Sequence, residues 1–241
     1  MDRFAPTYHV RGFTLIELAI VVFIVALLLG TLLVPLGSQV EQRNITQTQK
    51  QLEEAREAIL GYAMVNGRLP RPATSDLDGN ERSSPCADPR ECTGLLPWVT
   101  LGLPKSDVWG KLYGYSVVPE FANAPFDFST GGTLKTVQTR ASNGNLQNLA
   151  TNQVAVVISY GPANWGRTEN GTDIADSSAT NVDEDVNNAK FHCATVADCT
   201  NFISRPRASN PAGAGGEFDD VLVWLPHTIL LTRMVAAGKL P

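Results

Sequence analysis

The chain has 241 residues, a length that allows one or two domains and no more. Hydrophobic residues make up 43% and charged residues 18%, which excludes a disordered chain. Lys and Arg total 19 against 24 Asp and Glu, so the formal net charge is -5. No basic patch of the kind found in nucleic-acid-binding proteins is visible in the sequence, and no nucleic-acid partner is expected.

The N-terminal forty residues depart most from this average. After a short polar leader, residues 1–12, the stretch 13–37 carries no charge except at Glu17. About 20 apolar residues span a bilayer, so the stretch is long enough for a transmembrane helix. It is longer than the apolar region of a secretory signal peptide, and no small-residue cleavage site follows it. Arg3 and Arg11 precede it, which favours a cytoplasmic N-terminus and an exported head.

Glu17 is the anomaly in this stretch. An ionisable side chain in a membrane helix costs free energy, and such a residue is a functional candidate by default. If the chain were cut after Gly12, the new α-amino group of Phe13 would lie one helical turn before Glu17. The carboxylate could then contact the amine of its own chain. It could instead contact the amine of an adjacent copy, which would set the stagger between subunits.

The sequence RGFTLIEL, residues 11–18, resembles the prepilin signature of type IV pilins and of the pseudopilins of type II secretion. The resemblance implies that a prepilin peptidase cuts between Gly12 and Phe13 and N-methylates Phe13. Glu17 matches the acidic residue on which assembly depends in that family. The implied location is the bacterial inner membrane, crossed once, with the head in the periplasm. Other pilin or pseudopilin subunits are then the expected partners in a helical filament.

Helical periodicity continues beyond the apolar stretch. In residues 38–66, apolar side chains recur at seven-residue steps, as at Ile45, Leu52 and Ile59, and predict an amphipathic helix. Asn66 and Gly67 form a good C-terminal stop. Pro35 removes one backbone hydrogen bond, so we expect a kink there. Two separate helices joined by a hinge are the alternative.

Residues 67–241 read as one head with a sheet and long loops. Short runs rich in β-branched and aromatic residues predict strands at residues 112–118, 154–160 and 221–225, with a further strand possible at 134–139. Residues 228–237 have helical character. The fold class is therefore α+β. The resemblance implies a pilin-like plan, a long N-terminal helix packed on a small antiparallel β-sheet.

Four cysteines occur in two C-x5-C pairs, Cys86 with Cys92 and Cys193 with Cys199. An even count in an exported head favours disulfides, for which three pairings are possible. The local pairs are favoured because each would staple a long loop at a small closure distance. A zinc site that includes His192 is the alternative, but the spacing is not that of zinc ligands.

Two acidic loops raise the question of calcium. Asp76 and Asp78 begin like a calcium loop, but the later positions exclude an EF-hand. Asp183 and Asp185 lie in the region where, by the resemblance, the major pseudopilin holds calcium. Surface acids and turn formers are the favoured interpretation of both loops, so no cofactor is expected and calcium stays a secondary possibility. The doublet Asp219-Asp220 is interpreted as capping or positioning the final strand.

Signatures of common enzyme classes are missing from the sequence. The leading interpretation is therefore a structural subunit of a type IV pilus or a type II secretion pseudopilus. The second is a minor or tip pilin whose long loops, longer than expected of a major pseudopilin, act as a binding or adhesion module. The third is a membrane-anchored periplasmic enzyme or sensor in which the Gly12–Phe13 bond stays intact.

Overall fold

The structure is a computed structural model that describes residues 13–188, 193, 195 and 199–241. The predicted leader, residues 1–12, and the side chains of residues 29–36 and 38 lie outside that description. The chain divides into two compact units, Met1–Asn44 and Ile45–Pro241, which are treated one at a time below.

The first unit contains the beginning of helix α1, which spans Leu15–Asn66. The structure assigns one helix to this range, and the alternative of two helices joined by a hinge is not observed. A kink was predicted at Pro35, and this residue is among those whose side chains are not described. Among the described residues, no helix is both long enough and apolar enough to cross a membrane. The span over residues 13–37 stays a prediction.

In the second unit, the C-terminal part of α1 presents one buried face. The buried side chains recur every three or four residues, as expected of an amphipathic helix, at Thr48, Leu52, Ala55, Ile59 and Ala63, and Leu60 next to Ile59 is buried as well. This confirms the predicted stripe. The helix ends at Asn66, and Gly67 follows with a positive φ of 74°, as the predicted stop requires.

The head is built on a six-stranded sheet with the order β1-β2-β4-β3-β5, and β6 also pairs with β4. The strands are β1 (Thr93–Leu95), β2 (Gly114–Val117), β3 (Lys135–Arg140), β4 (Leu146–Ser159), β5 (Asn201–Ile203) and β6 (Val221–Pro226). The prediction of an antiparallel sheet is wrong for one pair, because β3 and β5 run parallel. All other pairs are antiparallel.

The predicted strands are found, with shifted ends. The largest difference is β4, which begins eight residues before the predicted start at Val154 (146 against 154). The short strands β1 and β5 and three short helices were not predicted. These helices are α2 (Trp98–Leu101), α3 (Pro119–Ala122) and α4 (Val182–Asn188). The predicted C-terminal helix is α5 (His227–Ala236).

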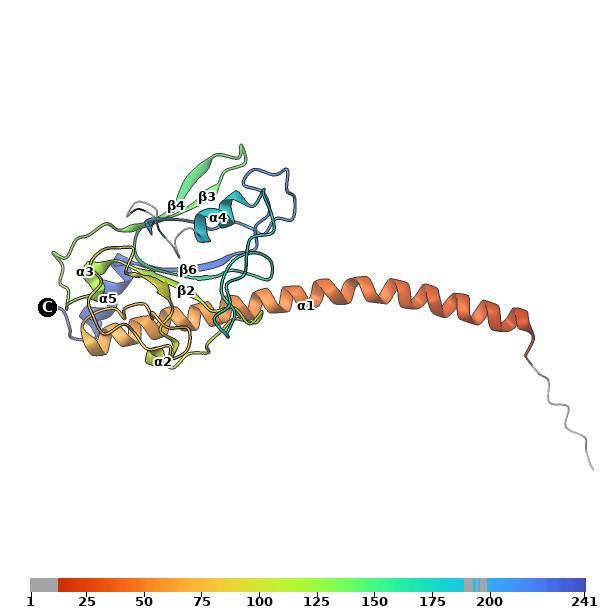
Figure 1. The fold of residues 1–241 in the computed structure, drawn as a ribbon, viewed down its shortest axis with the longest axis horizontal. Helices are drawn as coiled ribbons and strands as arrows, with labels where there is room; N and C mark the ends of the chain where they lie inside the picture. The colour runs from red at the N-terminus through yellow and green to blue at the C-terminus, as the bar shows by residue number, and fades with distance from the viewer. Residues whose placement is uncertain (1–12, 189–192, 194, 196–198) are drawn as a thin grey trace, which may run out of the picture. The chain divides into compact units, whose positions relative to one another are not determined.

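Side chains alternate between the two faces of the sheet. Val157 of β4 and Val223 of β6 face the main core, which α1 and α5 complete with side chains such as Leu52 and Leu230. Val156 faces the opposite side, where it packs with Phe202 of β5. Helix α5 lies beside the C-terminal end of α1 (Figure 1), and Arg233 of α5 pairs with Glu57 of α1 at 3.4 Å. The sheet thus has α1 and α5 on one face.

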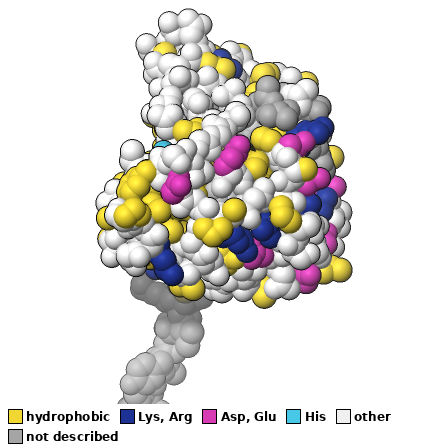
Figure 2. Space-filling model, turned by 90° about the vertical axis from the view of Figure 1, so that its left-hand side faces the viewer, with side chains coloured by type: hydrophobic (Ala, Val, Ile, Leu, Met, Phe, Trp, Pro, Cys, Tyr) yellow, Lys and Arg dark blue, Asp and Glu magenta, His cyan; other side chains and the backbone are white. Residues whose placement is uncertain are grey.

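On the surface of the head seen in Figure 2, basic, acidic and hydrophobic side chains are interspersed.

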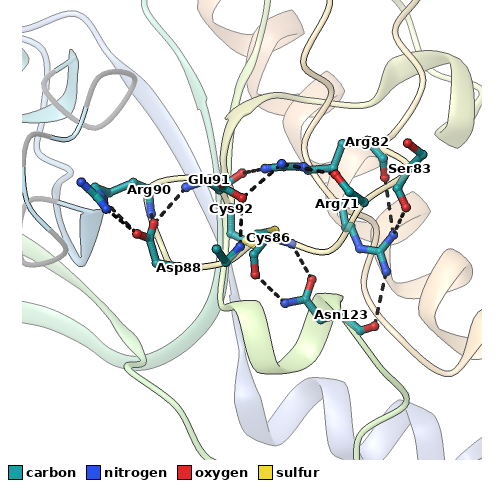
Figure 3. A network of polar contacts seen from close by, with 11 residues as sticks. Arg71, Arg82, Ser83, Cys86, Asp88, Arg90, Glu91, Cys92 and Asn123 are labelled. Carbon is teal, nitrogen blue, oxygen red and sulfur yellow. Dashed lines mark hydrogen bonds and ion pairs between the residues drawn. A yellow bond between two sulfur atoms is a disulfide. The ribbon is translucent and has the colours of Figure 1, made fainter.

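Both disulfides join the local pairs, Cys86 with Cys92 and Cys193 with Cys199, as predicted. The zinc alternative is therefore wrong, and His192 lies outside the described residues. The first disulfide loop is anchored on α3 by Asn123 (Figure 3). The Asn123 side chain accepts a hydrogen bond from Cys86 N at 2.9 Å and donates one to Cys86 O at 2.8 Å. These two hydrogen bonds fix the disulfide loop against the head.

Glu81 joins the end of α1 to the loop that follows it. Its carboxylate receives two hydrogen bonds from the Arg68 guanidinium, at 2.9 and 2.8 Å, one from Arg71 N at 3.0 Å and one from the Tyr62 hydroxyl at 2.5 Å. Burial works against the charged form. The hydrogen bonds from Arg68, Arg71 and Tyr62 nevertheless lower the pKa of Glu81 to about 2. The ionised carboxylate is therefore the form on which this junction depends.

Replacing this carboxylate tests the junction. A carboxyl group whose pKa is lower in the folded state adds stability above its unfolded pKa, and that stability is lost as the pH falls toward the folded pKa. We expect Glu81→Gln to lower the free energy of unfolding at pH 7 by about 2 kcal/mol. Denaturant titrations between pH 7 and pH 2 should show a smaller acid-induced loss for the variant. Parallel curves for variant and wild type would contradict this.

Candidate functional site

The start of α1 holds the predicted assembly residue in a reciprocal cap. The Glu17 carboxylate accepts hydrogen bonds from Thr14 N and from the Thr14 hydroxyl, both at 2.9 Å. Glu17 N donates back to the Thr14 hydroxyl oxygen at 3.3 Å. This is a capping box, which satisfies backbone N–H groups that the first helical turn leaves free. The T-x-x-E spacing of Thr14 and Glu17 is the sequence signal for this cap, which was not predicted.

Beside this cap, the first unit exposes a continuous apolar surface. Phe13, the predicted methylation site, is 85% exposed, and Gly12 lies outside the described residues. Every large apolar side chain between residues 13 and 28 is 47% to 88% exposed. Exposed apolar surface of this extent marks a contact with lipid or protein.

The four aspartates considered for calcium do not come together. The Asp183 carboxylate is fully buried and forms ion pairs with Arg140 at 2.6 Å and with Arg205 at 2.7 Å. Asp185 accepts a hydrogen bond from the Trp165 indole at 3.0 Å. In the other loop, the Asp76 carboxylate pairs with Arg167 at 3.6 Å, and the Asp78 carboxylate accepts from Asn80 N at 3.2 Å. Each aspartate thus has a separate partner.

Another acidic group is assembled from three buried carboxylates. Oxygens of Glu184, Asp219 and Asp220 lie within 4.8 Å of one another, and the three residues are 2%, 9% and 7% exposed. Glu184 accepts hydrogen bonds from Asp219 N at 2.7 Å and from the Asn181 amide at 3.0 Å. Within the described residues, this is the one group of acidic or metal-binding side chains with such spacing.

Burial and mutual repulsion dominate the electrostatics of this group. Burial, followed by the Glu184 charge, raises the pKa of Asp219 to about 6. Burial also raises the pKa of Asp220 well above its ordinary value, against a hydrogen bond from Asn187. The Oδ1 atom of Asp219 is buried without a hydrogen-bond partner among the described atoms. Burial therefore favours the neutral forms of these carboxyl groups, and a positive charge close by would stabilise the ionised forms.

Lys111 brings a positive charge to the same part of the head. It is 3% exposed, and its ammonium donates hydrogen bonds to the carbonyl oxygens of Tyr160, Ala163 and Asn164, at 3.3, 3.0 and 3.0 Å. Burial lowers the pKa of Lys111, and the charges of Asp219, Asp107, Asp220 and Glu184 oppose that shift.

The turn that carries Lys111 is fixed by Asp107. The Oδ1 atom of Asp107 accepts from Trp109 N and Lys111 N, both at 2.9 Å, and Oδ2 accepts from the Ser159 hydroxyl at 2.6 Å. These contacts tie the turn to the end of β4, directly before the carbonyls that bind the ammonium. No role for Lys111 was predicted from the sequence.

Gly161 shows how closely this region is packed. Its φ is 55°, and a Cβ atom there would collide with the Asp219 carboxylate and carbonyl oxygen. We expect Gly161→Ala to lower the free energy of unfolding by about 3 kcal/mol, through backbone strain and overpacking. Gly102 has a similar φ of 67° but open space around it, so Gly102→Ala should cost only about 1–2 kcal/mol. Chemical denaturation of the detergent-solubilised chain measures both, and equal losses would contradict the packing argument.

Comparison with known proteins gives one match. A family model described as the prokaryotic N-terminal methylation motif matches residues 8–33, a range that includes the Gly12–Phe13 junction, the cap and Glu17. No curated protein and no solved structure matches the chain. The chain thus carries the prokaryotic N-terminal methylation motif, the signature of type IV pilins and pseudopilins.

Proposed function

We propose that the chain is a filament-forming subunit of the pilin and pseudopilin class, a structural protein and not an enzyme. The methylation motif over residues 8–33 carries the proposal, because it implies processing by a prepilin peptidase and assembly with other pilin subunits. Cleavage falls between Gly12 and Phe13, and the new amino group of Phe13 is methylated. The filament is a type IV pilus or a type II secretion pseudopilus.

The exposed apolar surface supports a membrane stage before assembly. Residues 13–37 hold the subunit in the inner membrane, with the N-terminus in the cytoplasm and the head in the periplasm. Burying such surface gains about 25 cal/mol per Å2, either in lipid or against neighbouring helices. Assembly then exchanges lipid contact for helix contact, a step in which dispersion and polar contacts decide the partner geometry.

Glu17 gives the assembled helices a defined stagger. In the precursor its carboxylate is held by Thr14, which offsets the cost of placing the charge at the membrane. After cleavage, the amine of a neighbouring Phe13 offers a stronger, charged partner. A carboxylate that can leave a local cap for a neighbouring amine makes packing register-specific.

The function is tested by separating the charge of Glu17 from its capping role. We expect Glu17→Val to enter the membrane normally but to incorporate into filaments at least about tenfold less, a loss of about 1.4 kcal/mol per subunit. The matched control is Thr14→Val, which removes the hydroxyl contacts of the cap and keeps the carboxylate. It should weaken the helix start by about 1 kcal/mol and still assemble. Quantitative blotting of membrane and sheared-filament fractions measures both.

Two results would oppose the proposal. Filaments at wild-type level from Glu17→Val would remove the assembly role of the carboxylate. Equal failure of both variants would show that Glu17 acts only through the cap of its own helix.

A further inference from the structure

We propose that Lys111 is a built-in cation. Its ammonium fills a cation site lined by the carbonyl oxygens of the turn after β4, and the same turn contacts the buried Asp219 carboxylate. The site holds the chain's own side chain where a bound metal ion would otherwise be needed to order the turn.

Every N–H donor of the Lys111 ammonium has a hydrogen-bond acceptor in this site. A lysine ammonium has three N–H donors, and three carbonyl oxygens accept from Lys111 at 3.0 to 3.3 Å. These carbonyls come from one short stretch, residues 160–164, which folds back so that the oxygens converge on one point. Converging carbonyl dipoles repel one another unless a cation lies between them. The turn therefore depends on the charge that it surrounds.

The donor set is the kind that calcium prefers. Carbonyl and carboxylate oxygens are the usual ligands of Ca2+, and both kinds are present here. The carbonyl oxygens, however, already bind Lys111, and Asp219 Oδ2 accepts a hydrogen bond from Ala163 N at 3.1 Å. A metal ion at the same point would have to displace a buried ammonium and lie beside its charge. With Lys111 in place, the residues do not fit a calcium ion at the carbonyls.

Electrostatics and placement support the same conclusion. The turn that binds the Lys111 ammonium also contacts the acidic group, because Ala163 N donates to Asp219 Oδ2 at 3.1 Å. Lys111 and the three carboxylates are all buried, so their opposite charges stabilise one another. The Asp107 contacts described above fix the backbone of Lys111, so the side chain reaches the carbonyls from a defined origin. A side chain attached in this way supplies the charge at every external calcium concentration.

Removing the ammonium should convert the turn into a site that responds to calcium. We expect the thermal midpoint of the full-length wild type in detergent micelles to be the same in CaCl2 and in EDTA. Lys111→Met should have a lower midpoint in EDTA. Adding CaCl2 at about 100 times its dissociation constant should raise that midpoint by about 5 °C.

A second buried lysine provides the matched control. Lys135 is fully buried and donates to the Cys199 carbonyl at 3.1 Å, a carbonyl outside residues 160–164. Lys135→Met should lose stability with no response to CaCl2. Lys111→Gln, whose amide can still donate to a carbonyl, is the milder variant if Lys111→Met does not fold, and it should also gain a calcium response.

Two outcomes would overturn the proposal. A wild-type midpoint that rises with CaCl2 and falls with EDTA would show that the site takes a metal ion despite Lys111, whichever variants fold. Loss of stability in the Lys111 variants without a calcium response, as in Lys135→Met, would show that Lys111 is an ordinary buried lysine. Neither result bears on whether the chain assembles into filaments.

Discussion

The exposed apolar surface at the start of α1 is the constraint on which the proposed function depends. Large side chains from Phe13 to Leu28 lie about half exposed or more, and leaving such surface in water would cost several kcal/mol. Lipid can cover it and so can other helices, and in the proposed filament a neighbouring helix would also offer its terminal amine to the carboxylate of Glu17. The methylation motif over the same residues connects this surface to processing and assembly.

In contrast to the exposed apolar side chains of the first unit, the head buries charged side chains. Glu81 is stabilised by two arginines and a tyrosine where α1 meets the following loop, and its charged form is favoured. At the far end of β4, three carboxylates are buried together, and the charge of Lys111 lies close to them. The first network closes the end of the helix, whereas the second orders the turn after the central strand. Both networks join segments of the head that are distant in the sequence.

Local patterns predicted the elements that are governed by local physics. The stripe of Leu52 and Ile59 followed from helical periodicity, and the buried half of β4 followed from its run of β-branched residues. Residues 146–152 of β4 were missed because their side chains are mostly polar and exposed, and pairing with β3 makes them a strand. The acidic group was missed because Glu184 and Asp219 are 35 residues apart and only the fold brings them together.

The intact mass of the protein purified from its native membrane tests the central claim most directly. The account predicts a chain that begins at Phe13 and carries one additional methyl group on its terminal amine. A chain that still begins with Met1, in cells whose prepilin peptidase is active, would contradict it.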